Sequence, residues 1–191
     1  MSRSLSPRLT IACLAALSCG LVLAGCAQTA APEPTQTSAP APEPTQTSAP
    51  DPASLTCDDI LPTSVLDSAL GASFTLNSDF VPQTGSAGSE LAAAGGVACE
   101  WTDGAGATVL VAAGEPGPTV IEAAKAEASR AGTATDVFGA SLTGFASGAS
   151  GSTIDVFSES GAWVQTTSTL YSSPSDAVSI VEQIMQALPS G

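Results

Sequence analysis

The chain has 191 residues with 18 acidic residues, 4 basic residues and no histidine, so its formal charge is −14. The absence of histidine excludes Ser-His-Asp and Cys-His catalysis and His-ligated zinc, copper or iron. The acidic excess argues against nucleic-acid binding, because phosphates would be repelled. Its simplest explanation is solubility on a crowded surface.

Residues 1–25 have the pattern of an export signal. Arg3 and Arg8 place positive charge before an apolar run over residues 11–23. That run is too short to cross the hydrocarbon core of a bilayer as a stable helix. We therefore expect this segment to be removed after export.

The four residues Leu23-Ala24-Gly25-Cys26 resemble a bacterial lipobox. The resemblance implies cleavage before Cys26 and a diacylglyceryl group on its sulfur, which would hold the protein to the extracytoplasmic face of the cell membrane. The alternative is a plain secretory signal followed by an unrelated cysteine.

Residues 26–54 are expected to form a lipidated N-terminus and a disordered linker. The decapeptide at 31–40 is repeated unchanged at 41–50, is rich in proline and threonine, and has no aliphatic residue larger than alanine. Such a segment cannot bury enough surface to offset its ordering entropy, and its prolines favour extended conformations. O-glycosylation and a bare spacer both remain open.

Residues 55–191 have the length of one domain. After cleavage the chain keeps two basic residues, Lys125 and Arg130, and all 18 acidic residues, so its formal charge is −16. Cys57 and Cys99 remain as an even pair in an exported domain, so we expect a disulfide between them. A redox centre is disfavoured, because the spacing is unlike Cys-x-x-Cys and no basic residue lies near in sequence.

The sequence of the first half of the domain predicts a helix, a strand, a long loop, a hairpin and a second helix, in this order. The helix over 63–70 ends at Gly71, and alternation predicts a strand over 73–77. A Gly/Ser/Ala-rich loop is expected over 82–96. The last elements are strands over 97–101 and 107–113 around Asp103-Gly104, then a helix over 119–131.

The sequence of the second half predicts the same order of elements, with strands and a hairpin followed by a helix. Short strands are expected over 134–138 and 141–145, and a hairpin joins 153–158 to 162–170. Ser173 begins the last helix, whose apolar stripe is Ala177, Ile180, Val181, Ile184 and Leu188. The predicted fold is α+β: a single antiparallel sheet with helices packed on it, built from two hairpin-helix units.

Two short motifs carry a further resemblance: Cys57-x-x-Ile60-Leu61-Pro62 before a helix ending in Gly71, and Cys99-Glu100-Trp101. With the lipobox and the linker, they resemble small cell-envelope lipoproteins of unknown function from mycobacteria and related high-GC Gram-positive bacteria. The resemblance implies an α+β envelope domain without an established chemistry. It also implies structural roles for the two cysteines and for Trp101.

The candidate site residues have structural explanations. Asp58 and Asp59 could form an acid/base pair or a calcium site, but two acids before a helix favour its positive end. Asp103-Gly104 is expected to be a turn. Trp101, Trp163 and Tyr171 could line a groove, although large aromatic residues in strands are usually core. Segments 82–96 and 146–152 are the best candidates for loops over a ligand.

We therefore predict no catalytic, cofactor-binding or metal-binding residue, and lipidation at Cys26. The expected function is a non-enzymatic binding domain of the cell envelope, whose partner is a small hydrophobic ligand, a wall component or an envelope protein. The alternatives are a sensory or accessory domain beside another envelope protein, and a hydrolase using paired carboxylates. An exposed apolar patch would favour the first alternative, and two converging acids with raised pKa values the second.

Overall fold

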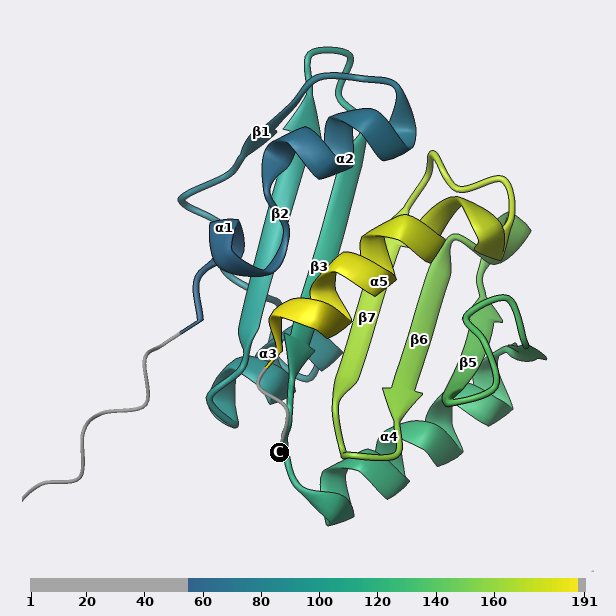
Figure 1. The fold of residues 1–191 in the computed structure, drawn as a ribbon. Helices are drawn as coiled ribbons and strands as arrows, with labels where there is room; N and C mark the ends of the chain where they lie inside the picture. The colour runs from purple at the N-terminus through teal and green to yellow at the C-terminus, as the bar shows by residue number, and fades with distance from the viewer. Residues whose placement is uncertain (1–54, 189–191) are drawn as a thin grey trace, which may run out of the picture. The chain divides into compact units, whose positions relative to one another are not determined.

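The structure is a computed structural model that describes residues 55–188 (Figure 1). The predicted signal peptide over 1–25, the lipidation site Cys26 and the linker over 26–54 lie outside the described residues. They remain predictions from the sequence.

Seven strands form one antiparallel sheet in the order β1-β2-β3-β7-β6-β5-β4. The strands are β1 (Phe74–Leu76), β2 (Val97–Asp103), β3 (Thr108–Gly114), β4 (Thr133–Thr135), β5 (Leu142–Ser147), β6 (Thr153–Ser158) and β7 (Trp163–Ser168). Each hairpin forms locally, but the pairing of β3 with β7 joins the two halves of the domain at the centre of the sheet. The predicted α+β fold is confirmed.

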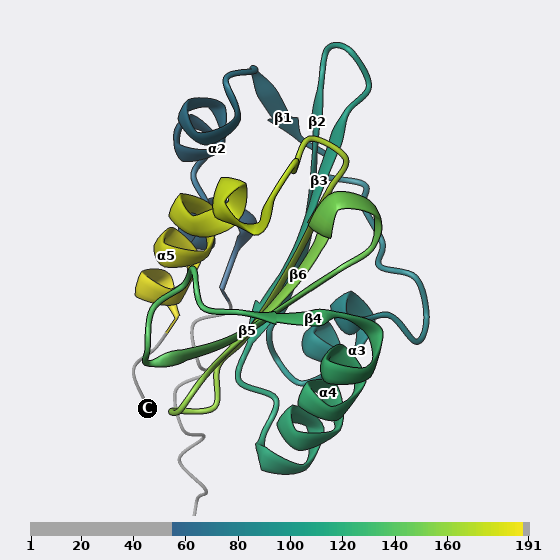
Figure 2. The ribbon, with the colours of Figure 1, turned by 90° about the vertical axis from the view of Figure 1, so that its right-hand side faces the viewer.

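Helices cover both faces of the sheet (Figure 2). The first face carries α1 (Cys57–Ile60), α2 (Thr63–Leu70) and α5 (Val178–Ala187), which follows the 3₁₀ turn η2 (Pro174–Ala177). The second face carries α3 (Ala87–Ala93) and α4 (Pro118–Ala131). A second 3₁₀ turn, η1 (Ala149–Gly151), precedes β6.

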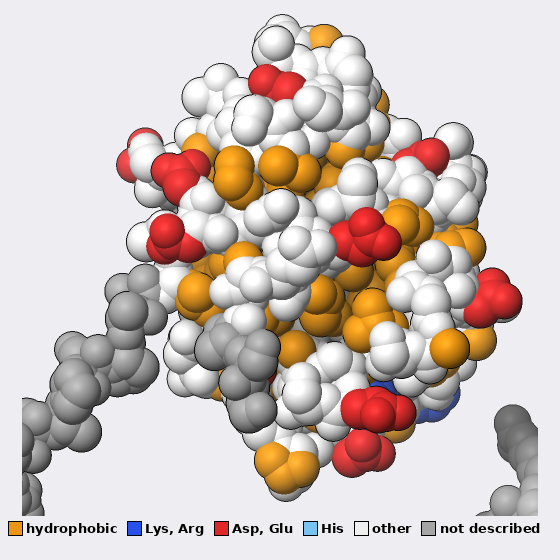
Figure 3. All heavy atoms as spheres, in the orientation of Figure 1, with side chains coloured by type: hydrophobic (Ala, Val, Ile, Leu, Met, Phe, Trp, Pro, Cys, Tyr) orange, Lys and Arg blue, Asp and Glu red, His pale blue; other side chains and the backbone are white. Residues whose placement is uncertain are grey.

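The larger core lies between the sheet and α5. The predicted stripe of α5 and its flanks is buried, with exposed fractions between 0% and 6%. It packs on residues of the central strands such as Val111, Val156 and Val164. In Figure 3 hydrophobic side chains lie between α2 and α5 and beside α5, with carboxylates scattered over the same face.

The second core is smaller and lies beneath α3 and α4. Its buried members are Leu91, Ala112, Ile121, Ala128, Phe157 and Trp163. Phe157 and Trp163 stack with ring centroids 5.7 Å apart. Two of these six members are alanines, and the cluster has fewer buried members than the first core, so the second face buries less apolar area.

The predicted disulfide is present. Cys57 and Cys99 are joined with a Cα–Cα distance of 5.8 Å. The bond ties α1 to the middle of β2, so it fastens the start of the domain to its central sheet.

Two predictions about local structure are wrong. Part of the expected loop over 82–96 is α3, which Ser86 begins by accepting a hydrogen bond from Ser89 N and which Leu91 anchors by complete burial. In addition, β4 and β5 lie at 133–135 and 142–147 instead of 134–138 and 141–145. Phe138, which was predicted to lie in a strand, lies instead in the turn between β4 and β5. Its apolar side chain is buried from that position.

Candidate ligand-binding groove

The paired acids at the start of the domain form a helix cap. The carboxylate of Asp59 accepts hydrogen bonds from the backbone N and the hydroxyl of Thr56, while Thr56 Oγ1 accepts from Asp59 N. These bonds lower the pKa of Asp59 below its usual value. Asp58 and Asp59 are both exposed, which agrees with the predicted structural role.

Asp103 is the last residue of β2, where the predicted hairpin turn to β3 begins. Its Oδ1 accepts hydrogen bonds from the backbone N of Ala105 at 2.9 Å and of Ala107 at 2.7 Å. The carboxylate closes the turn, so its interactions are structural.

The three large aromatic residues do not share a groove. Trp101 and Tyr171 are buried on the α5 face, where Tyr171 Oη and Thr166 Oγ1 are hydrogen-bonded at 2.7 Å. Burial raises the pKa of Tyr171 to about 12. Trp163 lies on the opposite face in the smaller core.

A groove of about 460 Å³ lies on the second face between α3 and α4. Its floor is polar and comes from β5, β6 and β7: Ser147, Thr153, Asp155, Trp163 and Gln165. Its walls are mostly alanine: Ala87 on α3, and Ala123, Ala124, Ala128 and Ala131 on α4. Glu90, Glu127 and Arg130 also line it.

The groove follows from how the two helices are placed. Helix α3 packs on β2 and β3, and α4 packs on β4, β5 and β6. Neither helix covers the middle of β7 and its border with β6, so the side chains there face the space between them. The small side chains of α4 leave that space unfilled.

Asp155 is the central polar group of the floor. It lies on β6 directly opposite Gln165 of β7 and Phe145 of β5. Its Oδ1 accepts hydrogen bonds from Trp163 Nε1 at 3.1 Å and from Gln165 Nε2 at 2.8 Å. The residue is only 6% exposed, and burial raises the pKa of its carboxyl above the usual value despite these two bonds.

The second carboxylate oxygen of Asp155, Oδ2, accepts no hydrogen bond from the protein, and the residue lines the groove. Both hydrogen bonds end on Oδ1. Within residues 55–188, the one fully enclosed side-chain polar atom without a hydrogen bond is Nε1 of Trp101 on the other face. Oδ2 is therefore neither bonded to the protein nor sealed inside it, and it can accept a hydrogen bond from a molecule in the groove.

The charges around the groove leave Asp155 without a cationic partner among the groove's own side chains. Arg130 is held by Glu127 at 2.8 Å, and both side chains are largely exposed. Lys125 lies at a different place on α4, 3.7 Å from Glu122 and 5.8 Å from the centroid of the Phe157 ring. The ionised side chains that line the groove thus carry a net charge of −2, from three acids and one arginine.

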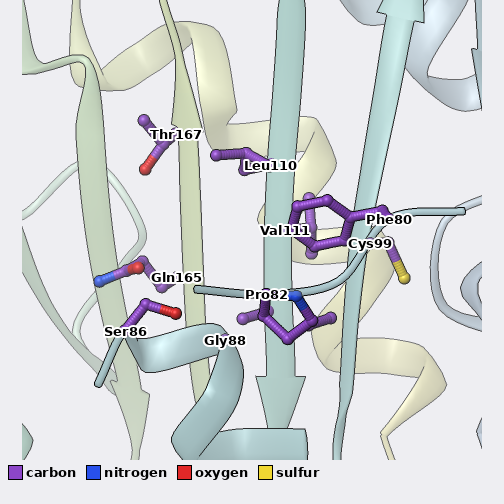
Figure 4. Close-up of a pocket in the computed structure, with 11 residues that line it drawn as sticks. Phe80, Pro82, Ser86, Gly88, Cys99, Leu110, Val111, Gln165 and Thr167 are labelled. Atoms are coloured by element: carbon purple, nitrogen blue, oxygen red, sulfur yellow. The ribbon is translucent and has the colours of Figure 1, made fainter. Parts of the chain in front are cut away.

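A second, smaller cavity of about 80 Å³ lies beside the groove on the same face. Phe80 and Pro82 lie over β2 and β3 in Figure 4, with Gln165 and Thr167 on the neighbouring β7. Gln165 lines both spaces. This cavity is too small for a ligand much larger than a few waters, so the groove is the better candidate site.

Asp155 and Gln165 were not predicted as site residues. The segments 82–96 and 146–152 were predicted as ligand-covering loops, and the structure brings Gly85, Ala87, Glu90 and Ser147 of these segments to the groove. One signal was present: an aspartate inside an apolar strand is unusual, because aspartate is depleted in strands and costly to bury.

No protein-family model, curated protein sequence or solved structure matches this chain. In the part of the chain that the structure describes, no group of three or more Cys, Asp or Glu side chains is arranged to hold a metal ion. None of the helices within residues 55–188 has both the length and the hydropathy of a membrane span.

Proposed function

We propose that this protein is an extracytoplasmic lipoprotein, anchored to the cell membrane at Cys26, whose α+β domain binds a small ligand in the groove between α3 and α4. The lipobox-like sequence and the linker support the anchor and the exposure of the domain on the cell surface. The resemblance to high-GC Gram-positive envelope lipoproteins supports the same location.

The observation that carries the binding function is the Asp155 carboxylate. Burying a carboxylate without a charge partner costs free energy, and the raised pKa reports that cost. Trp163 and Gln165 hold one oxygen in place and leave the other without a hydrogen bond from the protein. A costly group that is held in a fixed position and left partly unsatisfied is typical of a binding site.

A binding role agrees with the groove better than the hydrolase alternative does. A carboxylate-based hydrolase needs a second carboxylate close to the first. Asp58 and Asp59 are exposed in the cap of α1, away from the groove. The other acids of the groove are Glu90 and Glu127, both exposed, and Glu127 is paired with Arg130.

The sensory or accessory alternative has less support. The large apolar side chains that are exposed among residues 55–188 are Val81, Val137 and Leu170. They are three single side chains on three different loops, whereas a protein interface is typically marked by a contiguous apolar patch.

The proposal is tested by intact-mass spectrometry of the mature protein purified from its native membrane, with and without reductant. We expect a lipid adduct on Cys26, and a mass gain of two hydrogen atoms when the reductant converts the Cys57–Cys99 disulfide to two thiols. A small molecule should be released on denaturation from the wild type and be absent from the Asp155→Asn variant. An unlipidated protein would contradict the anchor, and a ligand retained equally by both proteins would contradict the groove.

A further inference from the structure

We infer that the ligand of the α3–α4 groove carries a primary ammonium group on a short aliphatic chain, and that Asp155 Oδ2 accepts a hydrogen bond from this ammonium. This inference rests on the proposed binding function and names the chemistry that the groove recognises.

The charge of the groove favours a cationic ligand. The groove holds Asp155, Glu90, Glu127 and Arg130, and Arg130 is already paired with Glu127. An anionic ligand would meet the uncompensated carboxylates and be repelled. A cation would supply the opposite charge that Asp155 lacks, where the low local dielectric strengthens the attraction.

Asp155 Oδ2 is the atom that a ligand meets at the floor of the groove. Trp163 and Gln165 donate to Oδ1 and thereby set the orientation of the carboxylate. Oδ2 remains as an acceptor on the floor of the groove, and an ionised carboxylate can only accept hydrogen bonds. The ligand must therefore present a donor there, and an ammonium group presents three.

The walls of the groove favour an aliphatic ligand. The walls are lined by small apolar side chains, with Ala87 on one side and Ala123, Ala124 and Ala128 on the other. Trp163 is only 4% exposed and stacks on Phe157, so it offers no open ring face for a sugar. Methyl-lined walls fit a chain of methylene groups, and the exposed acid Glu90 at the rim suits a second cationic group on the same chain.

This chemistry is shared by free diamines and by lysine-like side chains of larger molecules. Three probes of equal chain length isolate the charge: cadaverine, 1,5-pentanediol and glutarate. Nα-acetyl-lysine methylamide, in which a backbone replaces the second amine, distinguishes the two sources.

The experiment is a titration of the ¹⁵N-labelled protein with each probe, followed by NMR of the indole N–H signals. The chain has two tryptophans, so two signals are expected. Trp163 donates to Asp155 and should report on the groove, whereas Trp101 lies on the other face of the sheet and is an internal reference. The Trp163→Phe variant assigns the two signals.

We expect cadaverine to shift the Trp163 signal in a saturable manner and to leave the Trp101 signal in place. Asp155→Asn should weaken binding by about 10- to 100-fold, because a charged acceptor is lost. Glu90→Gln should weaken it only about two- to threefold, because an exposed charge is screened by water and salt. Asp136→Asn, a carboxylate-to-amide change on an exposed turn, is the matched control and should leave binding unchanged.

Two results would overturn the inference. One is no saturable shift with either amine, and the other is a response to pentanediol that is as strong as that to cadaverine and survives Asp155→Asn. A small-molecule extract of the native envelope separates this failure from failure of the proposed function. If the extract shifts the Trp163 signal while the amines do not, the groove binds a ligand of another class, and if neither shifts it, both proposals fail.

Discussion

The indole nitrogen of Trp163 donates a hydrogen bond to Oδ1 of Asp155 across 3.1 Å, between adjacent strands at the centre of the sheet. The same ring stacks on Phe157, the next residue of β6 on this face. The tryptophan thus belongs to the core and also sets the orientation of the buried carboxylate. This double role makes the effect of changing either residue predictable.

Asp155→Asn is expected to preserve or increase stability at neutral pH. Asparagine keeps the Oδ1 acceptor for Trp163 and Gln165 but removes a buried charge that lacks a cationic partner. We expect a gain on the order of 1 kcal/mol in the free energy of unfolding, measured by urea titration with Asp136→Asn as the surface control. A loss of stability larger than that of the control would mean that the ionised carboxylate supports the fold.

The same pair of proteins should show a defined pH dependence. Burial raises the folded-state pKa of Asp155 above its unfolded value, so the folded protein binds this proton more tightly than the unfolded chain does. The contribution of Asp155 to the free energy of unfolding of the wild type therefore increases as the pH falls through the raised pKa. The advantage of Asp155→Asn should be largest at neutral pH and shrink toward acid, as urea titrations across the pH range would show. A difference that grows toward acid would contradict the burial of this carboxylate.

The Asp176 carboxylate should contribute to stability with the opposite pH dependence. Its carboxylate accepts hydrogen bonds from Ser172 N at 2.8 Å, Ser172 Oγ at 2.9 Å and Ser173 N at 3.0 Å, which together lower its pKa. This stabilisation is present above the ordinary pKa of 3.8 and is lost as the pH falls through the lowered value. Asp176→Asn should destabilise the protein at pH 7 by no more than about 1 kcal/mol, because the group is solvated. Thermal melts of the variant and the wild type should converge at low pH, and a constant offset would count against this role.

Removal of the Cys57–Cys99 disulfide should destabilise the domain strongly. The bond closes a loop with a sequence separation of 42 residues, for which the chain-entropy model gives about 4 kcal/mol. The double variant Cys57→Ala/Cys99→Ala should lose a free energy of unfolding of this order in urea titrations. Wild-type protein unfolded in the presence of reductant should behave like the double variant. An unchanged midpoint in both would show that the unfolded chain is not restricted by this bond.

Gly96 should not accept a side chain. A Cβ atom there would lie 2.5 Å from the carbonyl oxygen of Ala113 and 3.1 Å from Cα of Gly114, where α3 is followed closely by β2. Because these neighbours are backbone atoms, Gly96→Ala should cost about 1 to 3 kcal/mol. Gly104→Ala is the matched control, since a Cβ at this turn position meets no atom within 4 Å, and it should change stability by less than about 0.5 kcal/mol. Equal melting temperatures for the two variants would contradict the close approach.

Most of the fold could be predicted from local patterns. The helix over 63–70, the strand over 153–158 and the apolar stripe of the last helix were predicted with the observed bounds or burial. Each rests on periodicity and on nearby turn or cap residues, so its cause is contained in a short window of sequence. The cysteine pair could also be predicted, because Cys57 and Cys99 are the two cysteines outside the predicted signal peptide and lipidation site.

Helix α3 could not be predicted from its local sequence. Its seven residues contain one large apolar side chain, Leu91, within a run of alanine, glycine and serine. Such a segment has little helical preference that can be seen in its pattern. The burial of Leu91 against β3 and the approach of Gly96 to Ala113 hold it in place, and both are contacts with a strand outside the local window, beyond β2 in the chain.

The sequence by itself determined the class of the domain, its helices and hairpins, its disulfide partners and the expectation of a lipid anchor, because each depends on neighbouring residues or on residue counts. Only the tertiary structure decided that β3 pairs with β7, that α3 and α4 leave the centre of the second face open, and that Asp155, Trp163 and Gln165 meet there. The physical reason is that a groove is the space left between packed elements. Its position depends on strand order and helix placement, which are set by burial summed over the whole domain.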